Sequence, residues 1–141
     1  MLVGVTAAIL DGSWEAHMKQ IPIGTSDEMV VETTSDMGVK HLPMPMYSTP
    51  TMVGHFEGIC LMMLIPFQDP GETSVGYKVS AKHMAPTPIG MNVTIKAKVK
   101  EQDDRKVVFE LEAYNATGAK IGEGEHERRV IDASRFSGGG S

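Results

Sequence analysis

The sequence predicts an α+β fold in which an antiparallel sheet wraps around one central helix. Two observations carry this prediction. Residues 50–65 are almost wholly apolar and have helical periodicity. Four later segments then follow a period of two, over residues 74–83, 91–100, 106–114 and, less regularly, 119–131. A helix followed by strands with one apolar face is typical of a helix packed on one side of an antiparallel sheet.

A chain of 141 residues fits one domain with an adequate core. We expect this domain over residues 19–136, followed by a Gly/Ser tail at 137–141. Residues 1–18 are interpreted as an N-terminal extension, for which an artificial origin and a native first strand both remain open. Its apolar run is too short to cross a membrane, so no membrane partner is expected.

The first strand is expected over residues 28–34, EMVVETT, ahead of the helix. The helix should begin with Thr49 as its cap and Pro50 at its first position, and it should end before Pro66. One apolar stripe on this helix consists of Met52, Phe56, Ile59, Cys60 and Met63.

Further apolar residues spread over most of the rest of the helix, which one sheet could not cover. We therefore expect a homodimer, and a dimer of dimers remains open.

Glu57 lies in the middle of this apolar helix, at the flank of the main stripe. It could face solvent at the helix edge, or it could be buried against a polar partner, because an unpaired buried carboxylate costs several kcal/mol.

The strands after the helix supply a candidate partner. Alternation in 74–83 places His83 on the apolar face with Val75, Tyr77, Val79 and Ala81, and this face should pack on the helix. Glu57 and His83 are therefore expected to meet. Residues 101–105 and 115–118 are predicted turns, the second with Gly118 at positive φ. In the last strand, Gly122 and Gly124 mark a bulge or a close backbone approach.

Composition excludes several function classes. Thirteen Lys and Arg against eighteen Asp and Glu give a net charge of −5 without a basic run, which argues against nucleic-acid binding. The single cysteine, Cys60, cannot form an intrachain disulfide and is predicted to be structural, which favours a reducing compartment and a cytoplasmic location. No metal-ligand spacing is evident, and His55 is interpreted as a helix residue near the subunit interface.

Three motifs then resemble a known family: TPTMVGHFE at the helix start, GYKVSAKHMAPTPIG around His83, and GEGEHERRVI in the last strand. Over about residues 21–136 the chain resembles the fluoroacetyl-CoA thioesterase group of hot-dog thioesterases. The resemblance implies the hot-dog fold, catalytic roles for Thr49, Glu57 and His83, and a backbone position at Gly76 that borders the thioester site. The segment KHLPMPMYST is shorter than the family's Phe-containing lid, so we expect a different, broader acyl group than fluoroacetyl.

These features predict an acyl-CoA thioesterase that hydrolyses a small or medium acyl-CoA, with coenzyme A as part of the substrate and no separate cofactor or metal. Either covalent attack by Glu57 or water attack with Glu57 as base would fit. Lys78, Lys82 and Arg128 are surface candidates for holding CoA. The alternative is a non-catalytic acyl-CoA-binding domain, a sensor or carrier. Hydration of an enoyl-CoA is less favoured, because no second acid pairs with His83.

Overall fold

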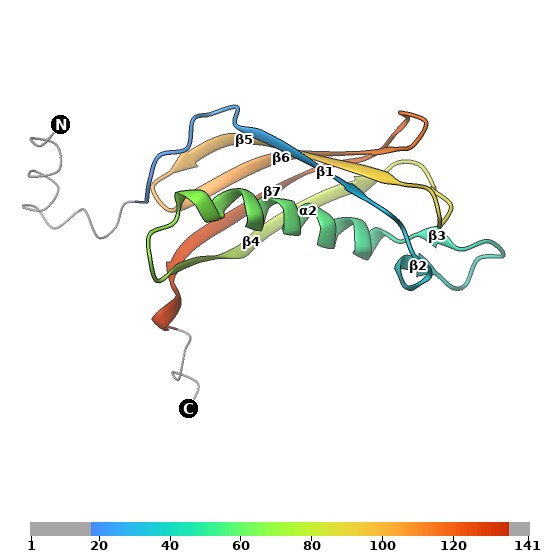
Figure 1. Ribbon diagram of the computed structural model, residues 1–141, viewed down its shortest axis with the longest axis horizontal. Helices are drawn as coiled ribbons and strands as arrows, with labels where there is room; N and C mark the ends of the chain where they lie inside the picture. Colours follow the sequence, from blue (N-terminus) through green and yellow to red (C-terminus); the bar gives the residue numbers. More distant parts are fainter. Residues whose placement is uncertain (1–17, 136–141) are drawn as a thin grey trace, which may run out of the picture.

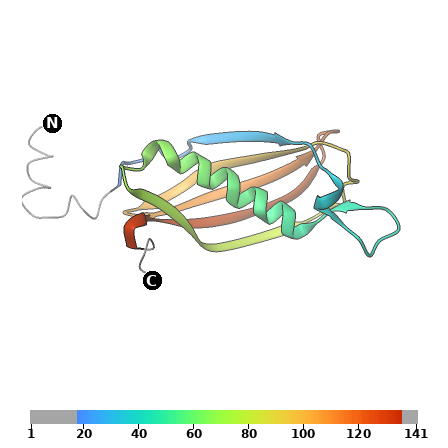
Figure 2. The same ribbon diagram turned by 60° about the horizontal axis from the view of Figure 1, so that its bottom comes forward.

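The computed structural model describes residues 18–135 and confirms the predicted architecture (Figure 1). One five-stranded antiparallel sheet has the order β1-β5-β6-β7-β4. Figure 2 shows the helix α2 lying along one face of this sheet, with β1 at one edge and β4 at the other. The main elements are β1 (Ser26–Val31), α2 (Thr49–Leu64), β4 (Glu72–His83), β5 (Val93–Asp103), β6 (Lys106–Asn115) and β7 (Lys120–Asp132).

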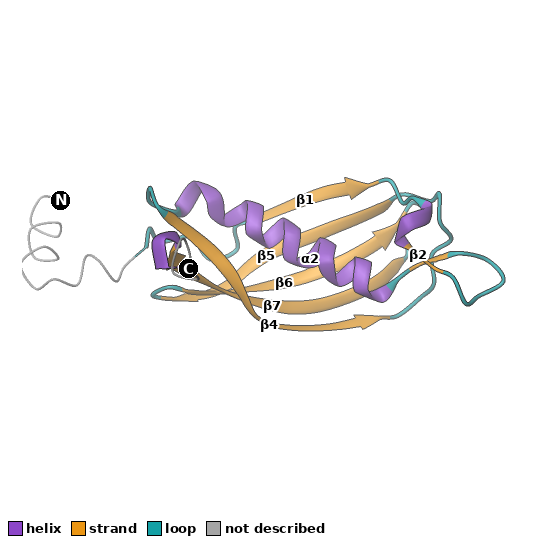
Figure 3. Ribbon diagram, turned by 90° about the horizontal axis from the view of Figure 1, so that it is seen from below, coloured by secondary structure: helices purple, strands orange, loops and turns teal. Residues whose placement is uncertain are grey.

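Short elements complete the ends of the fold. A small second sheet pairs β2 (Gly38–Val39) with β3 (Met46–Tyr47). The loop between them, residues 40–45, projects beyond the end of the main sheet near the start of α2 (Figures 1 and 3). Three 3₁₀ turns are η2 (Ser35–Met37), η3 (Ile65–Phe67) and η4 (Ala133–Arg135).

The helix begins one residue earlier than the sequence predicts. Its cap is Ser48, whose Oγ accepts a hydrogen bond from the Thr51 amide at 3.2 Å, and Thr49 is the first helical residue. The expected cap at Thr49 is therefore wrong. Since Ser48 satisfies the helix end, the Thr49 hydroxyl is available for another partner.

The core forms where α2 meets the concave face of the sheet. The predicted helix stripe of Met52, Phe56, Ile59, Cys60 and Met63 is buried, as is Leu64. Alternate residues of β5 and β6 meet it, as their period of two predicts: Val93, Ile95, Ala97 and Val99, and Val107, Phe109, Leu111 and Ala113. Met18, within the predicted extension, is also buried in this core; residues 1–17 lie outside the described range.

A β-bulge in β4 changes which residues face the helix. The register with β7 shifts between Gly76 and Lys78, leaving Tyr77 as the extra residue. Beyond the bulge, His83 pairs with Gly122 and Val79 with the buried His126, so the predicted inward direction is confirmed for these residues.

Before the bulge the prediction is wrong. Val75 pairs with Arg129, and the centroid of the Tyr77 ring lies 4.1 Å from Cζ of Arg129. Val75 and Tyr77 therefore lie on the outer face of the sheet. One extra residue inverts the side-chain alternation of every residue that follows it.

The glycine positions behave as predicted. Gly118 has a φ of 86° in the β6–β7 turn. A Cβ on Gly124 would collide with the Ser80 carbonyl oxygen of the neighbouring strand, and a Cβ on Gly122 would come within 2.5 Å of the Met52 sulfur. Both glycines allow the close backbone approach expected of them.

Apolar surface remains uncovered on α2 and β4. Leu61, Met62 and Ile65 are exposed at the outer side of the helix end, and residues 75–82 of β4 are all exposed. By length and composition the segment Thr49–Phe67 could cross a membrane, but the core helix of a globular fold passes the same test, and here the sheet covers one side of it.

Candidate active site

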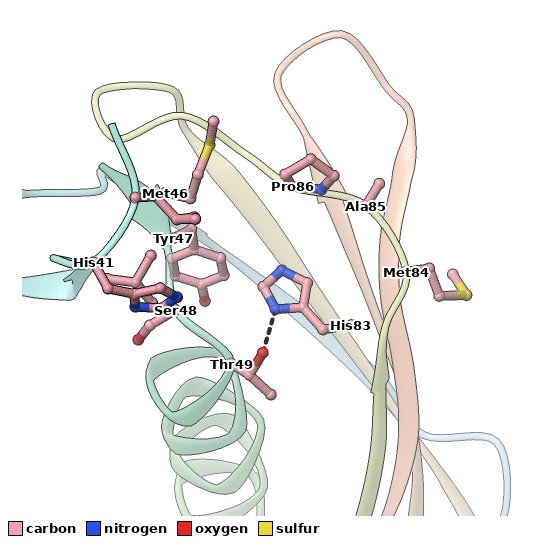
Figure 4. Close-up of a pocket in the computed structure, with 11 residues that line it drawn as sticks. His41, Met46, Tyr47, Ser48, Thr49, His83, Met84, Ala85 and Pro86 are labelled. Carbon is pink, nitrogen blue, oxygen red and sulfur yellow. Dashed lines mark hydrogen bonds between the residues drawn. The ribbon is translucent and has the colours of Figure 1, made fainter. Parts of the chain in front are cut away.

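The N-terminus of α2 and the C-terminus of β4 bring together two of the three predicted catalytic residues. A hydrogen bond of 2.7 Å joins Thr49 Oγ1 and His83 Nδ1 (Figure 4). The Ser48 cap places Thr49 at the first helical position, and the bulge in β4 is followed by the alternation that turns His83 inward. Residues 34 positions apart therefore form one polar pair.

The second ring nitrogen of His83 is unpartnered. Nε2 is buried and has no hydrogen-bond partner within the described part of the chain, residues 18–135. It points away from Thr49 toward the space between Tyr47 and Pro86 (Figure 4). Burial lowers the pKa of His83, so the imidazole is neutral at pH 7. When Nδ1 donates to Thr49, Nε2 carries a lone pair that can accept a proton.

Tyr47 supports this imidazole from the side. Its ring meets that of His83 edge-on, with centroids 6.1 Å apart and planes at 80°. Its hydroxyl is 2.6 Å from Nδ1 of His55, whose pKa burial also lowers. The sequence interpretation of His55 did not include this contact. Tyr47 lies in β3, just before α2, and His55 lies eight residues later within the helix.

A cavity of about 330 Å³ opens beside the Thr49–His83 pair. Its walls come from two segments, residues 39–49 around β3 and residues 83–86 after β4 (Figure 4). Six of the eleven lining residues are apolar, and the polar Thr49–His83 pair lies among them.

Glu57 does not meet His83 within one protomer. No hydrogen bond joins them, and burial is the only cause that lowers the pKa of His83. Glu57 lies eight residues after Thr49, about 12 Å further along the helix axis. Its charge acts instead on Cys60, His126 and Arg128. The expected contact between Glu57 and His83 is therefore absent from the single chain.

The region near Glu57 contains a buried polar network that the sequence did not reveal. Arg128 Nε donates to Ser74 Oγ at 2.9 Å, and Nη2 donates to the Ser74 carbonyl at 2.9 Å. Arg128 Nη1 donates to His126 Nε2 at 3.1 Å, while His126 Nδ1 donates to the Lys78 carbonyl at 2.8 Å. These bonds fix one neutral tautomer of His126, and burial lowers its pKa.

Arg128 is 7% exposed, so its expected place at the surface is wrong. The even positions of the HERR segment face the core, and only the register of β7 against β4 shows this.

The other predicted binding residues lie at different faces. Gly76 pairs with Arg128, and its Cα hydrogen side faces the His126 ring, where a Cβ would come within 3.3 Å of Cε1. Lys78 and Lys82 are exposed and pair with Glu127 and Glu123 of β7, on the sheet face opposite to His83. The protomer thus does not bring these lysines to the cavity.

Within residues 18–135, no group of three or more His, Cys, Asp and Glu side chains is arranged to hold a metal ion.

Comparison with known proteins gives a consistent result. Residues 25–134 match the model of a family described as fluoroacetyl-CoA-specific thioesterase. A curated fluoroacetyl-CoA thioesterase from Streptantibioticus cattleyicolor is 34% identical over 91 residues, which cover 64% of this chain and 65% of that protein.

Solved structures agree in fold. A thioesterase superfamily member from Thermus thermophilus superposes with a TM-score of 0.79 at 30% identity, covering 84% of this chain and 90% of that one. A fluoroacetyl-CoA thioesterase gives 0.77 at 28% identity, with 84% and 93% covered. A variant of that enzyme, solved in complex with fluoroacetate and CoA, gives 0.75 at 28% identity, with 83% and 100% covered.

Proposed function

The chain belongs to the fluoroacetyl-CoA-specific thioesterase family, and from this premise we propose that it hydrolyses an acyl-CoA thioester to a carboxylic acid and CoA. One observation carries the proposal. The neutral His83, held by Thr49, directs a buried and unpartnered ring nitrogen toward an apolar cavity. An acyl group bound there would place its carbonyl beside a general base.

The chemistry requires two proton movements. Water, or a carboxylate, attacks the acyl carbon, and the C–S bond breaks as the thiolate leaves. If water attacks, a base takes its proton, and the same proton can pass to the departing CoA sulfur. His83 Nε2 is the candidate for this transfer, and Thr49 orients the ring through Nδ1. Glu57 supplies the carboxylate in either route. As the nucleophile it would form a mixed anhydride with the acyl group, which water then cleaves to release the acid and restore Glu57; as the base it would take the proton of the attacking water, which His83 passes on to the sulfur. No cofactor beyond the CoA of the substrate is needed.

We further propose that the functional unit is a homodimer. β4 is an edge strand, and its exposed run of residues 75–82 includes Val75, Tyr77 and Val79. An unpaired edge that exposes these three apolar side chains favours pairing with another strand. Antiparallel pairing of two β4 strands, centred on this run, would continue the sheet across both copies and cover the uncovered side of β4.

Such a dimer would also reunite the separated catalytic groups. Pairing about the centre of residues 75–82 brings His83 of one copy to the level of Ser74–Gly76 in the other. That level is where Arg128 and His126 lie, on which Glu57 acts electrostatically. The partner subunit's Glu57 is therefore the carboxylate proposed to act with Thr49 and His83 across the interface.

The deciding experiment is a thiol-release assay with acetyl-, butyryl-, hexanoyl- and benzoyl-CoA. We expect turnover by the wild type, and a loss of about a hundredfold or more in kcat for Glu57→Gln, which keeps the volume but removes the charge. Glu110→Gln, a matched change on the exposed outer face of β6, should retain wild-type kcat.

Binding of acyl-CoA without thiol release would instead support the non-catalytic alternative. A wild-type rate in folded Glu57→Gln would refute the proposed mechanism. A cytoplasmic location, supported by the single buried Cys60, remains part of the proposal.

A further inference from the structure

The cavity beside His83 is lined by eleven residues of differing polarity. Six of these residues are apolar, Val39, Leu42, Met46, Met84, Ala85 and Pro86, although Met84 directs its side chain away from His83 (Figure 4). Among residues 18–135, no Lys, Arg, Asp or Glu contributes to this lining; its ionisable residues are His41, which is exposed, Tyr47 and His83 itself. Apart from the Thr49–His83 end, the cavity therefore offers an acyl group mainly hydrocarbon contacts.

We propose that the acyl group of the substrate is an uncharged hydrocarbon chain longer than two carbons, which lies against Leu42, Met46 and Pro86. This inference rests on the proposed thioesterase function and specifies its substrate. The carbonyl would remain at the Thr49–His83 end, while the chain extends between the 40–45 loop and residues 84–86.

The size of the cavity supports a chain of this length. A volume of about 330 Å³ lies at the lower end of pockets that hold small-molecule ligands. A two-carbon acyl group would leave most of that space to water, which has few polar partners on these walls. A longer chain would replace this water and bury more hydrocarbon.

One exposed apolar residue of the lining would gain such a partner. Leu42 is 44% exposed and belongs to the 40–45 loop, whereas the side chain of Met84 points away from His83 and Tyr47 (Figure 4). A hydrocarbon chain beside this loop would remove apolar surface of Leu42 from water.

Charge gives the second half of the selectivity. An acyl group that ends in a carboxylate would lose hydration among these apolar walls without a Lys or Arg partner in the lining. Succinyl-CoA should therefore be a poor substrate compared with butyryl-CoA, which has the same number of acyl carbons.

The test compares kcat/KM for acetyl-, fluoroacetyl-, butyryl-, hexanoyl- and succinyl-CoA. Each buried methylene is worth up to about fourfold in binding, so hexanoyl-CoA should exceed acetyl-CoA by at least about tenfold even in an open cavity. Butyryl-CoA should exceed succinyl-CoA by a similar factor. A preference for acetyl- or fluoroacetyl-CoA, equal rates for all chain lengths, or comparable rates with succinyl-CoA would overturn the inference.

A matched pair of variants locates the chain in the cavity. Leu42→Trp adds volume to the lining and should reduce the hexanoyl-to-acetyl ratio by about fivefold or more. Met44→Trp makes the same kind of change in the same exposed loop, but Met44 is outside the lining, so the ratio should stay at the wild-type value. Equal effects of both variants would show that the chain does not bind there.

A binding measurement separates this inference from the proposed function. Non-hydrolysable hexyl-CoA and ethyl-CoA thioethers are titrated into the wild type and into Leu42→Trp by calorimetry. Tighter binding of the hexyl compound, reduced by Leu42→Trp, supports the acyl cavity even if no thioester is hydrolysed. Equal Kd values for the two thioethers overturn it even if hydrolysis is found.

Discussion

Mixing two inactive variants tests whether the catalytic groups meet across a dimer interface. In the protomer Thr49 holds His83 at 2.7 Å, while Glu57 lies about 12 Å further along α2 and acts on another cluster. Reacting groups must approach to about 3–3.5 Å, so one protomer does not supply all three to one thioester. We therefore expect Glu57→Gln and His83→Ala to be inactive alone and active together.

The expected recovery follows from the geometry. Random mixing makes about half of the dimers heterodimers. In each heterodimer one site carries both substitutions and the other site carries neither, so half of its sites are intact. About a quarter of wild-type activity should therefore return. Each parent variant should be about a hundredfold or more below the wild type. The double variant should lose much less than the product of the two single losses, because residues that act as one unit are not additive.

The assay uses two differently tagged variants, mixed by unfolding and refolding together. Heterodimers are purified through both tags, and thiol release from hexanoyl-CoA is measured beside each parent treated in the same way. A pure heterodimer should reach about half of the wild-type rate, since one of its two sites is intact. Heterodimers as inactive as their parents would show that each site is built from one chain, and a stable monomer in sedimentation at micromolar concentration would refute the dimer itself.

Three further predictions concern the fold around the site. Cys60→Ala should cost about 1–2 kcal/mol of unfolding free energy and change kcat by less than about twofold, because the thiol is buried in the helix stripe and burial raises its pKa; a folded but inactive variant would require a new assignment of the nucleophile. Gly124→Ala should cost about 2–3 kcal/mol in denaturant unfolding, because its Cβ would collide with the Ser80 backbone, and an unchanged midpoint would contradict the close approach of β7 to β4. Burial lowers the pKa of His55, His83 and His126 below 6.5 in the folded state, so the unfolded chain binds more protons than the folded one as the pH falls. The free energy of unfolding should therefore be highest above about pH 6.5 and decline below it. A melting temperature that is constant from about pH 7.5 to 5.5 would refute this prediction.

Much of the fold was accessible from local patterns. The apolar stripe on residues 52–63 is buried as its helical period predicts, and the inward residues of β5 and β6 follow from a period of two. Gly118 has the positive φ expected of its turn. These features depend on residues close together in the chain, whose side-chain directions are set by backbone geometry alone.

Three features of the site required the tertiary structure. The bulge at Tyr77 inverts the faces of β4, so that Ser74 and Gly76 face inward with Arg128 although the alternation pattern places them outside. The cap at Ser48 in place of Thr49 leaves the Thr49 hydroxyl to His83. The Tyr47–His55 contact depends on the direction in which the chain passes from β3 into α2.

The sequence by itself determined the class of fold, the helix that forms its core, the inward direction of His83, and, through resemblance, the family. The tertiary structure decided which polar groups meet: Thr49 with His83, and Arg128 with Ser74 and His126. The physical reason is that periodicity fixes the direction of a side chain relative to its own backbone, whereas a hydrogen bond depends on the register between segments that the sequence separates. A single bulge or a one-residue shift of a helix cap changes that register without changing the hydrophobic pattern.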